Sequence, residues 1–247
     1  MIRRLVGAAI GLAVLPLGTT AYADTTMPTP GAPCTPGGGQ GTGNPCNGNN
    51  GNPSPEGNAQ EKVRYDRKPP PFSIARPGDD RGAYIDQIGS DNAAGIEQSD
   101  NRQFARIAQT GASNQAAIQQ RGSGNHYAAL RQSGDANAAL LEQDGDGLQV
   151  ALATQDGNRN ALFLRQNGAN GQSGAEMIQA GNDNTMSLTQ DGEGNQARLT
   201  QTGSGNAMTA TQIGDNNQLT WMQIGDNLSD LAITQDGGKA IMVTQSR

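Results

Sequence analysis

Glutamine recurs at nearly every eleventh residue between positions 87 and 245 of this 247-residue chain. In the regular stretch "QDGEGNQARLTQTGSGNAMTATQIGDNNQLTWMQIGDN" (190–227), Gly follows each Gln by two residues and Asn follows most of them by five. Small or apolar residues follow at seven and nine. Nine of the fourteen intervals are eleven residues and the rest are ten, twelve or thirteen. The repeating positions are Gln87, Gln98, Gln109, Gln120, Gln132, Gln143, Gln155, Gln166, Gln179, Gln190, Gln201, Gln212, Gln223, Gln235 and Gln245.

The spacing inside each unit predicts one β-strand and one turn. Asn, the two apolar residues and the next Gln are two residues apart, so their side chains share one face of a strand. The other face carries polar residues such as Gln196, Arg198 and Gln218, which we expect in water. Gly supplies the positive φ angles of a tight reversal. A helix does not fit, because this spacing forms no 3.6-residue stripe and Gly and Asn recur too often.

Two neighbouring units predict one strand-turn-strand layer of about 22 residues. Residues 81–247 therefore predict an all-β domain, a two-sided parallel β-solenoid of about seven layers. At about 4.8 Å per layer, this body would be about 30 to 35 Å long. Slips of one or two residues can be absorbed in the turns without changing which face is inside.

In such a solenoid alternate Gln residues lie above one another in two columns. A buried amide left unpaired costs about 2 to 7 kcal/mol, but an identical amide above and below satisfies its donor and its acceptor. We expect Asn to form a similar ladder at the other end of the strands. A turn preference of Asn and Gly is the alternative, and it does not account for Gln. The expected Asn rungs are Asn92, Asn114, Asn137, Asn160, Asn184, Asn195, Asn206 and Asn217.

The two ends of the predicted array carry no capping helix in the sequence. One layer alone buries too few apolar side chains to offset the entropy of ordering its residues. Stability must then come from stacking, and the end layers present unpaired strand edges. The natural use of such edges is to add another copy.

The N-terminal region differs in composition from the array. Residues 1–23 predict a signal peptide, with Arg3 and Arg4 before an apolar run and Ala21-Tyr22-Ala23 as cleavage site. The alternative is an uncleaved anchor, but the run is short for a bilayer. Residues 24–80 predict a Pro/Gly/Asn-rich disordered linker. Within it, Cys34 and Cys46 could form a disulfide after export, or remain two thiols.

Composition argues against several other functions. A net charge of −6 with three Lys offers no basic patch for nucleic acid. We expect no metal site, because the single His, His126, is far from both cysteines in sequence and is predicted on the solenoid surface. We also expect no cofactor. A calcium-binding β-roll needs a nine-residue period, and an ice-binding solenoid needs regular Thr ranks. A β-helical polysaccharide enzyme needs carboxylates clustered in a cleft of long loops, whereas these loops are short. We therefore expect no catalytic residues.

Three segments, "QIGSDNAAGIEQ" (87–98), "QTGASNQAAIQQ" (109–120) and "QDGEGNQARLTQ" (190–201), resemble the repeat of the curlin family. This resemblance implies a secreted structural subunit of extracellular, cell-surface amyloid (curli-like) fibres that serve biofilm matrix and adhesion. It implies as partners further copies, related curlin-like subunits, an outer-membrane secretion pore and a periplasmic chaperone. The alternatives are a minor subunit that nucleates the fibre and a soluble β-solenoid binding or adhesin protein.

Overall fold

The computed structural model describes residues 61–247. The predicted signal peptide, residues 24–60 of the predicted linker, and both cysteines lie outside this range. The described strands are β1 (Lys62–Asp66), β2 (Gly82–Ile88), β3 (Ala93–Gln98), β4 (Phe104–Thr110), β5 (Gln115–Gln120), β6 (Tyr127–Ser133), β7 (Ala138–Asp144), β8 (Leu148–Asp156), β9 (Ala161–Asn167), β10 (Gln172–Ala180), β11 (Thr185–Asp191), β12 (Gln196–Thr202), β13 (Ala207–Ile213), β14 (Gln218–Ile224), β15 (Leu231–Asp236) and β16 (Ala240–Ser246). Nothing helical in this range is long and apolar enough to cross a membrane.

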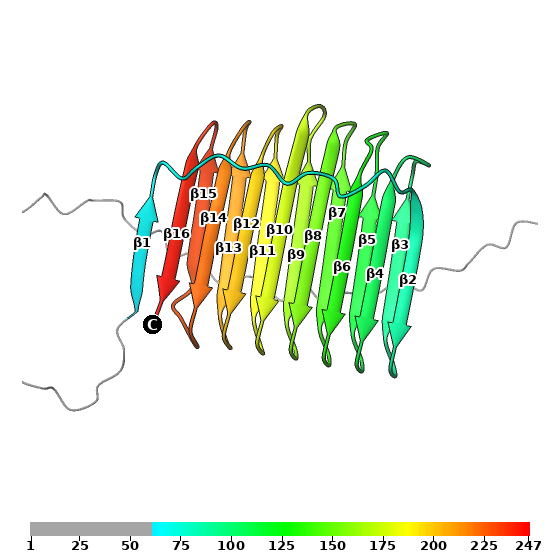
Figure 1. Cartoon of the computed structure of the whole chain (residues 1–247), viewed down its shortest axis with the longest axis horizontal. Coiled ribbons are helices and arrows are strands. Elements are labelled where there is room, and N and C mark those ends of the chain that lie inside the picture. The colour runs from blue at the N-terminus through cyan, green and yellow to red at the C-terminus, as the bar shows by residue number, and fades with distance from the viewer. Residues whose placement is uncertain (1–60) are drawn as a thin grey trace, which may run out of the picture. The chain divides into compact units, whose positions relative to one another are not determined.

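Strands β2 to β16 alternate between two sheets (Figure 1). Sheet A has the order β1-β16-β14-β12-β10-β8-β6-β4-β2, and sheet B has the order β15-β13-β11-β9-β7-β5-β3. Neighbours in each sheet are parallel, except that β1 is antiparallel to β16. Each pair such as β2 and β3 forms one layer, and β16 begins an eighth. The prediction of a parallel β-solenoid of about seven layers is confirmed.

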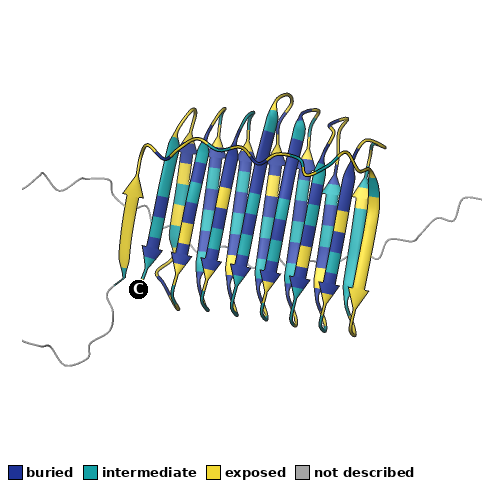
Figure 2. Cartoon of the chain, viewed as in Figure 1, coloured by how far each residue is buried: buried dark blue, intermediate teal, exposed yellow. Residues whose placement is uncertain are grey.

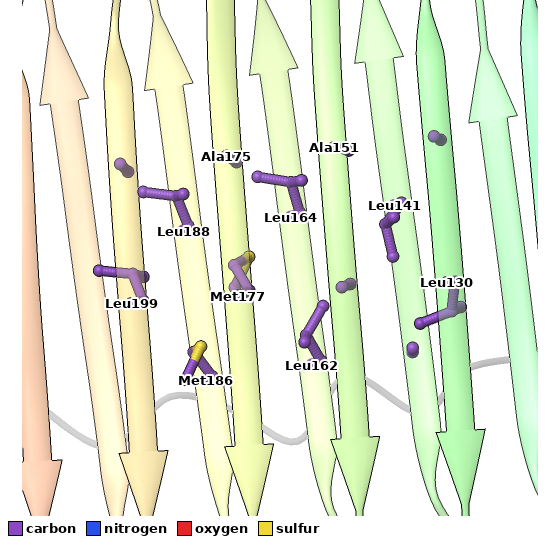
Figure 3. Close-up of a cluster of buried hydrophobic side chains, with 14 of the residues drawn as sticks. Leu130, Leu141, Ala151, Leu162, Leu164, Ala175, Met177, Met186, Leu188 and Leu199 are labelled. Atoms are coloured by element: carbon purple, nitrogen blue, oxygen red, sulfur yellow. The ribbon is translucent and has the colours of Figure 1, made fainter. Parts of the chain in front are cut away.

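The core lies between the two sheets, and burial alternates along the interior strands (Figure 2). Leu188, Leu199 and Trp221 are fully buried, and Figure 3 shows Leu188 and Leu199 projecting into the core beside Met177 and Met186. Small and large residues compensate each other within a layer. In the β8–β9 layer sheet A supplies Ala151 and Ala153 while sheet B supplies Leu162 and Leu164, which keeps the packed volume steady.

The turns explain the glycine of each unit. Gly157, two residues after a repeating Gln, has φ of 118°, and a Cβ there would lie 2.0 Å from the carbonyl oxygen of Gly181 in the next layer. Any side chain at this place would therefore separate the layers. Two residues further on, the chain adopts a left-handed conformation, which Ala136 and Arg159 occupy without being glycine.

Residues 62–80 depart from the linker prediction, which was wrong for this part. Strand β1 pairs with β16. The following strap, residues 67–81, runs along sheet A to β2 (Figure 1). The Ile74 side chain is 5% exposed, and the Ile74 N–H donates to Gln196 Oε1 at 2.8 Å. Gln196 was expected in water and is instead buried, because the strap covers it.

Candidate functional site: amide ladders and two unlike ends

The repeating Gln side chains form two continuous hydrogen-bonded columns. In sheet A the column runs from Gln87 to Gln245, and each Nε2 donates to the Oε1 of the next layer at 2.6–3.0 Å. In sheet B it runs from Gln98 to Gln235 at 2.7–2.9 Å. From Gln109 to Gln245 in sheet A and from Gln120 to Gln235 in sheet B, the side chains are buried. All fifteen expected Gln residues stand in these columns.

Each repeating Gln after Gln87 also ties its own sheet to the opposite one. The second hydrogen of Gln201 Nε2 donates to the carbonyl oxygen of Thr185 in sheet B at 3.1 Å. Conversely, Gln212 Nε2 in sheet B donates to the carbonyl oxygen of Gln196 in sheet A at 3.2 Å. Because both N–H groups and the oxygen of an interior amide are paired, its burial leaves no unsatisfied polar atom.

The ladders have a direction, and this makes the two ends chemically different. Every Gln–Gln bond in the two columns runs from the Nε2 of one layer to the Oε1 of the next, more C-terminal layer. At the N-terminal end, the Oε1 atoms of Gln87 and Gln98 accept no side-chain donor from the described residues. At the C-terminal end, Gln235 and Gln245 hold the last Nε2 donors.

Asparagine forms a further column beside the turns that lead from sheet A to sheet B. The backbone N–H of Asn114 donates to Asn92 Oδ1 at 3.0 Å, and Asn114 Nδ2 donates to the Gly134 carbonyl oxygen at 2.7 Å. The same contacts continue through Asn137, Asn160, Asn184 and Asn206. Asn195 and Asn217 stand in the other turn column, where the Asn217 N–H donates to Asn195 Oδ1 at 3.0 Å.

That second turn column begins with side chains that the Asn spacing did not predict. Gln103, His126, Gln149 and Ser173 are buried there in successive layers. Each lies six residues before a repeating Gln, as do Asn195 and Asn217. The deviating units carry their extra residues ahead of this position, in the turn. Gln103 also lies five residues after Gln98, whereas His126, Gln149 and Ser173 are found only by counting back from the following Gln.

The prediction that His126 lies on the surface was wrong. Its side chain is fully buried, and Nε2 lies 2.9 Å from the Arg121 carbonyl oxygen and 3.1 Å from that of Gly145. Two carbonyl acceptors require a proton on Nε2. Nδ1 is buried without a hydrogen-bond partner. Burial lowers the pKa of His126 below its usual value, which the carbonyl contacts and the carboxylates of Asp144 and Asp146 oppose.

Three exposed ion pairs link adjacent layers on the outside of the solenoid. Arg106 and Asp86 (2.8 Å), Arg159 and Asp183 (2.6 Å), and Arg198 and Glu176 (2.6 Å) each join two adjacent layers. Such exposed pairs contribute little stability, about 0 to 1 kcal/mol each. Within residues 61–247 no three His, Cys, Asp or Glu residues lie close enough to hold a metal ion.

The end layers are where the described chain is incomplete. Strands β2 and β3 each have one unpaired edge, and so does β15. Ile85 stacks on Ile107 and points along the core column, yet it is 45% exposed because no layer built from residues 61–247 covers it. The N-terminal end thus presents apolar surface, two open strand edges and two amide oxygens to a further layer.

The comparison with protein families agrees with this geometry. A family model described as the curlin associated repeat matches residues 181–214, which contain β11, β12 and β13. Neither a curated protein nor a solved structure matches the chain at a significant level. The matched segment lies in the most regular part of the ladders. The resemblance to the curlin repeat expected from the sequence is confirmed in this segment.

Proposed function

We propose that this chain is a structural subunit that is secreted and self-assembles into extracellular curli-like amyloid fibres of the biofilm matrix, where it serves adhesion. The observation that carries the proposal is the pair of directional Gln ladders. They run through every layer and begin at Gln87 and Gln98, whose side-chain oxygens have no donor among residues 61–247. Another copy of the same chain supplies the missing donors at the same spacing. We propose no catalytic role, no cofactor and no nucleic acid partner.

The layers favour growth by stacking over a finished monomer. Each interior strand has a parallel neighbour on both sides, and the same contacts can continue into an added layer without new chemistry. The exposed Ile85 gives this addition an apolar contribution. Turn carboxylates such as Asp146 and Asp183 lie on the outside, where their charge opposes side-to-side association.

The proposed route to the surface uses residues 1–23 as a signal peptide. A chain whose single layers are unstable alone can stay unfolded until it is outside the cell. Passage through an outer-membrane pore, with a periplasmic chaperone that holds the chain unfolded, fits this requirement. Nucleation by a related curlin-like subunit fits it as well.

Fibre formation by purified residues 24–247 tests the proposal. Thioflavin-T fluorescence should rise after a lag that added fibre seeds shorten. Fibre diffraction should give a meridional reflection at about 4.7 to 4.8 Å. A chain that stays monomeric for days under these conditions, without cross-β diffraction, would contradict the proposal and favour a soluble β-solenoid binding protein.

A further inference from the structure

We propose that the C-terminal end of the solenoid, formed by β15 and β16, receives the next copy of the chain, and that Glu61–Asp66 occupies part of this end in the free subunit. The incoming copy then has to displace these residues. This inference rests on the proposed function. It adds three points: which end of the solenoid is covered, which residues cover it, and how the second copy is oriented.

Strand β1 differs from every other strand of sheet A. It is antiparallel to its neighbour, with Lys62 opposite Ser246 and Asp66 opposite Met242. All five of its residues are exposed, so it is held chiefly by its backbone pairing with β16. Its charged residues, Lys62, Arg64 and Asp66, lie on a sheet edge, where charge discourages further strand addition. The C-terminal edge of sheet A is therefore covered by β1, a weakly held strand that does not belong to the repeat.

Glu61 stands where the next Gln of the sheet A ladder would stand. Gln245 Nε2, the last donor of that ladder, donates to Glu61 Oε1. Ser229 donates to Glu61 Oε2 through its N–H at 3.0 Å and its hydroxyl at 2.8 Å. An ionised carboxylate accepts hydrogen bonds and donates none, so the ladder ends there. The hydrogen bonds from the Ser229 backbone and from Gln245 lower the pKa of Glu61 and keep it ionised.

The N-terminal end of a second copy offers what Glu61 replaces. Its Gln87 and Gln98 have free Oε1 atoms, and their own Nε2 groups continue the ladder into their next layers. Strand β15 has no neighbour beyond it, so its backbone edge is already available. Gln235 Nε2 donates to the Gln218 and Lys239 carbonyl oxygens at 2.9 and 3.1 Å, and it has to release that of Lys239 to bond to the second copy. Only the half of the end built by β16 has to be uncovered.

The number of strands fixes how the second copy is turned. Fifteen strands, β2 to β16, alternate between the sheets, so the chain both begins and ends in sheet A. Unbroken stacking therefore places the second copy's β2 on β15 and its β3 on β16. That copy is rotated by about half a turn around the fibre axis, which also makes its strand directions match. An unrotated copy would leave one strand position empty above β15.

Locking β1 to β16 tests the displacement step. Arg64 and Thr244 are directly opposite each other in the antiparallel pair, and such pairs have Cα atoms about 4.5 to 5.5 Å apart, which a disulfide can span. The variant carries Arg64→Cys and Thr244→Cys, with Cys34→Ser and Cys46→Ser. Oxidised, it should elongate wild-type seeds at least about tenfold more slowly than when reduced. Thr244→Cys alone, in the same background, is the control and should elongate equally in both conditions.

A second variant tests the role of Glu61 without a covalent lock. Glu61→Ala removes the carboxylate that ends the ladder and should shorten the lag several-fold. Glu142→Ala makes the same charge change on β7, away from both ends, and should leave the lag unchanged. Equal elongation by oxidised and reduced chains, with an unaltered lag in Glu61→Ala, would overturn the inference. A wild-type chain that forms no fibres would overturn the proposed function instead.

Discussion

Each interior Gln makes three side-chain hydrogen bonds. These bonds determine how much stability is lost when one Gln is replaced. Gln201 accepts from Gln179 at 3.0 Å and donates to Gln223 at 2.8 Å and to the Thr185 carbonyl oxygen at 3.1 Å. Gln201→Ala leaves buried donors and acceptors unpaired, so we expect a loss of about 1 to 3 kcal/mol in the free energy of unfolding. Urea denaturation measures it, and a longer lag should accompany it.

The matched control for this substitution is Gln218→Ala. Gln218 stands on the outer face and is partly exposed. Its side chain forms no hydrogen bond within the described residues, so we expect little change in stability or lag. If both variants lost the same stability, the recurrence of Gln would reflect composition, and the fold would depend on its apolar face alone.

His126 makes the stability of the fold depend on pH near neutrality, whereas the Gln, Ser and Asn side chains of its turn column do not. Its pKa is below the usual value of about 6.5 in the folded chain because it is buried. As the pH falls below about 6.5, the unfolded chain takes up a proton that the folded chain does not, so stability decreases. Gln103 and Gln149 occupy the same place in other layers, so His126→Gln should fit and remove this dependence. Unfolding free energies at about pH 7.5 and about pH 5.5 for both chains measure the difference; parallel pH curves would contradict it.

Among the elements, several turns hold non-glycine residues in the left-handed backbone conformation, which strains a residue with a Cβ. Ala136 has φ of 57°, whereas Gly205 occupies the same turn position in a later layer with φ of 69°. A left-handed conformation costs a residue with a Cβ about 1 to 2 kcal/mol, partly offset by the greater chain entropy of Gly. Ala136→Gly should therefore stabilise the protein by about 0.5 to 1 kcal/mol in thermal or urea unfolding. Ala112→Gly, at a position of the preceding layer's turn where φ is not positive, should not. Equal gains would show that strain is not the cause.

The strands that carry the repeat could be predicted from the sequence. Strand β1, which lies outside the repeat, could not. The two-residue alternation between Asn206 and Gln212 specifies β13, its inner face and its position above β11. Strand β1 alternates too, with Val63 and Tyr65, but it follows a Pro- and Gly-rich region and pairs with residues near the opposite end of the chain. Only tertiary pairing distinguishes it from a linker. Likewise, the hydrogen bond between Ile74 and Gln196 joins residues 122 positions apart, and no local sequence pattern predicts it.

At the scale of the whole molecule, the repeat makes stability a property of stacking. No layer holds itself together, and each inner layer depends on both neighbours for backbone, amide and apolar contacts. The two terminal layers are therefore the least stable, and they differ from each other in how they are covered. One is left open at Ile85 and Gln87, and the other is half covered by β1. A subunit built in this way has a direction, and so does a fibre in which every copy is stacked in the same sense.

That direction and the odd number of strands predict the symmetry of the fibre. Fifteen strands make seven and a half layers, so at about 4.8 Å per layer each copy should advance the fibre by about 36 Å. Each copy should also be rotated by about half a turn from the last, apart from the twist of the sheets. Helical reconstruction by electron cryo-microscopy measures both the rise and the rotation. A rise of about 38 Å with almost no rotation would mean that copies stack unrotated as eight-layer units with one strand position empty. In that case Gln245 would face Gln87, rather than Gln98, of the next copy.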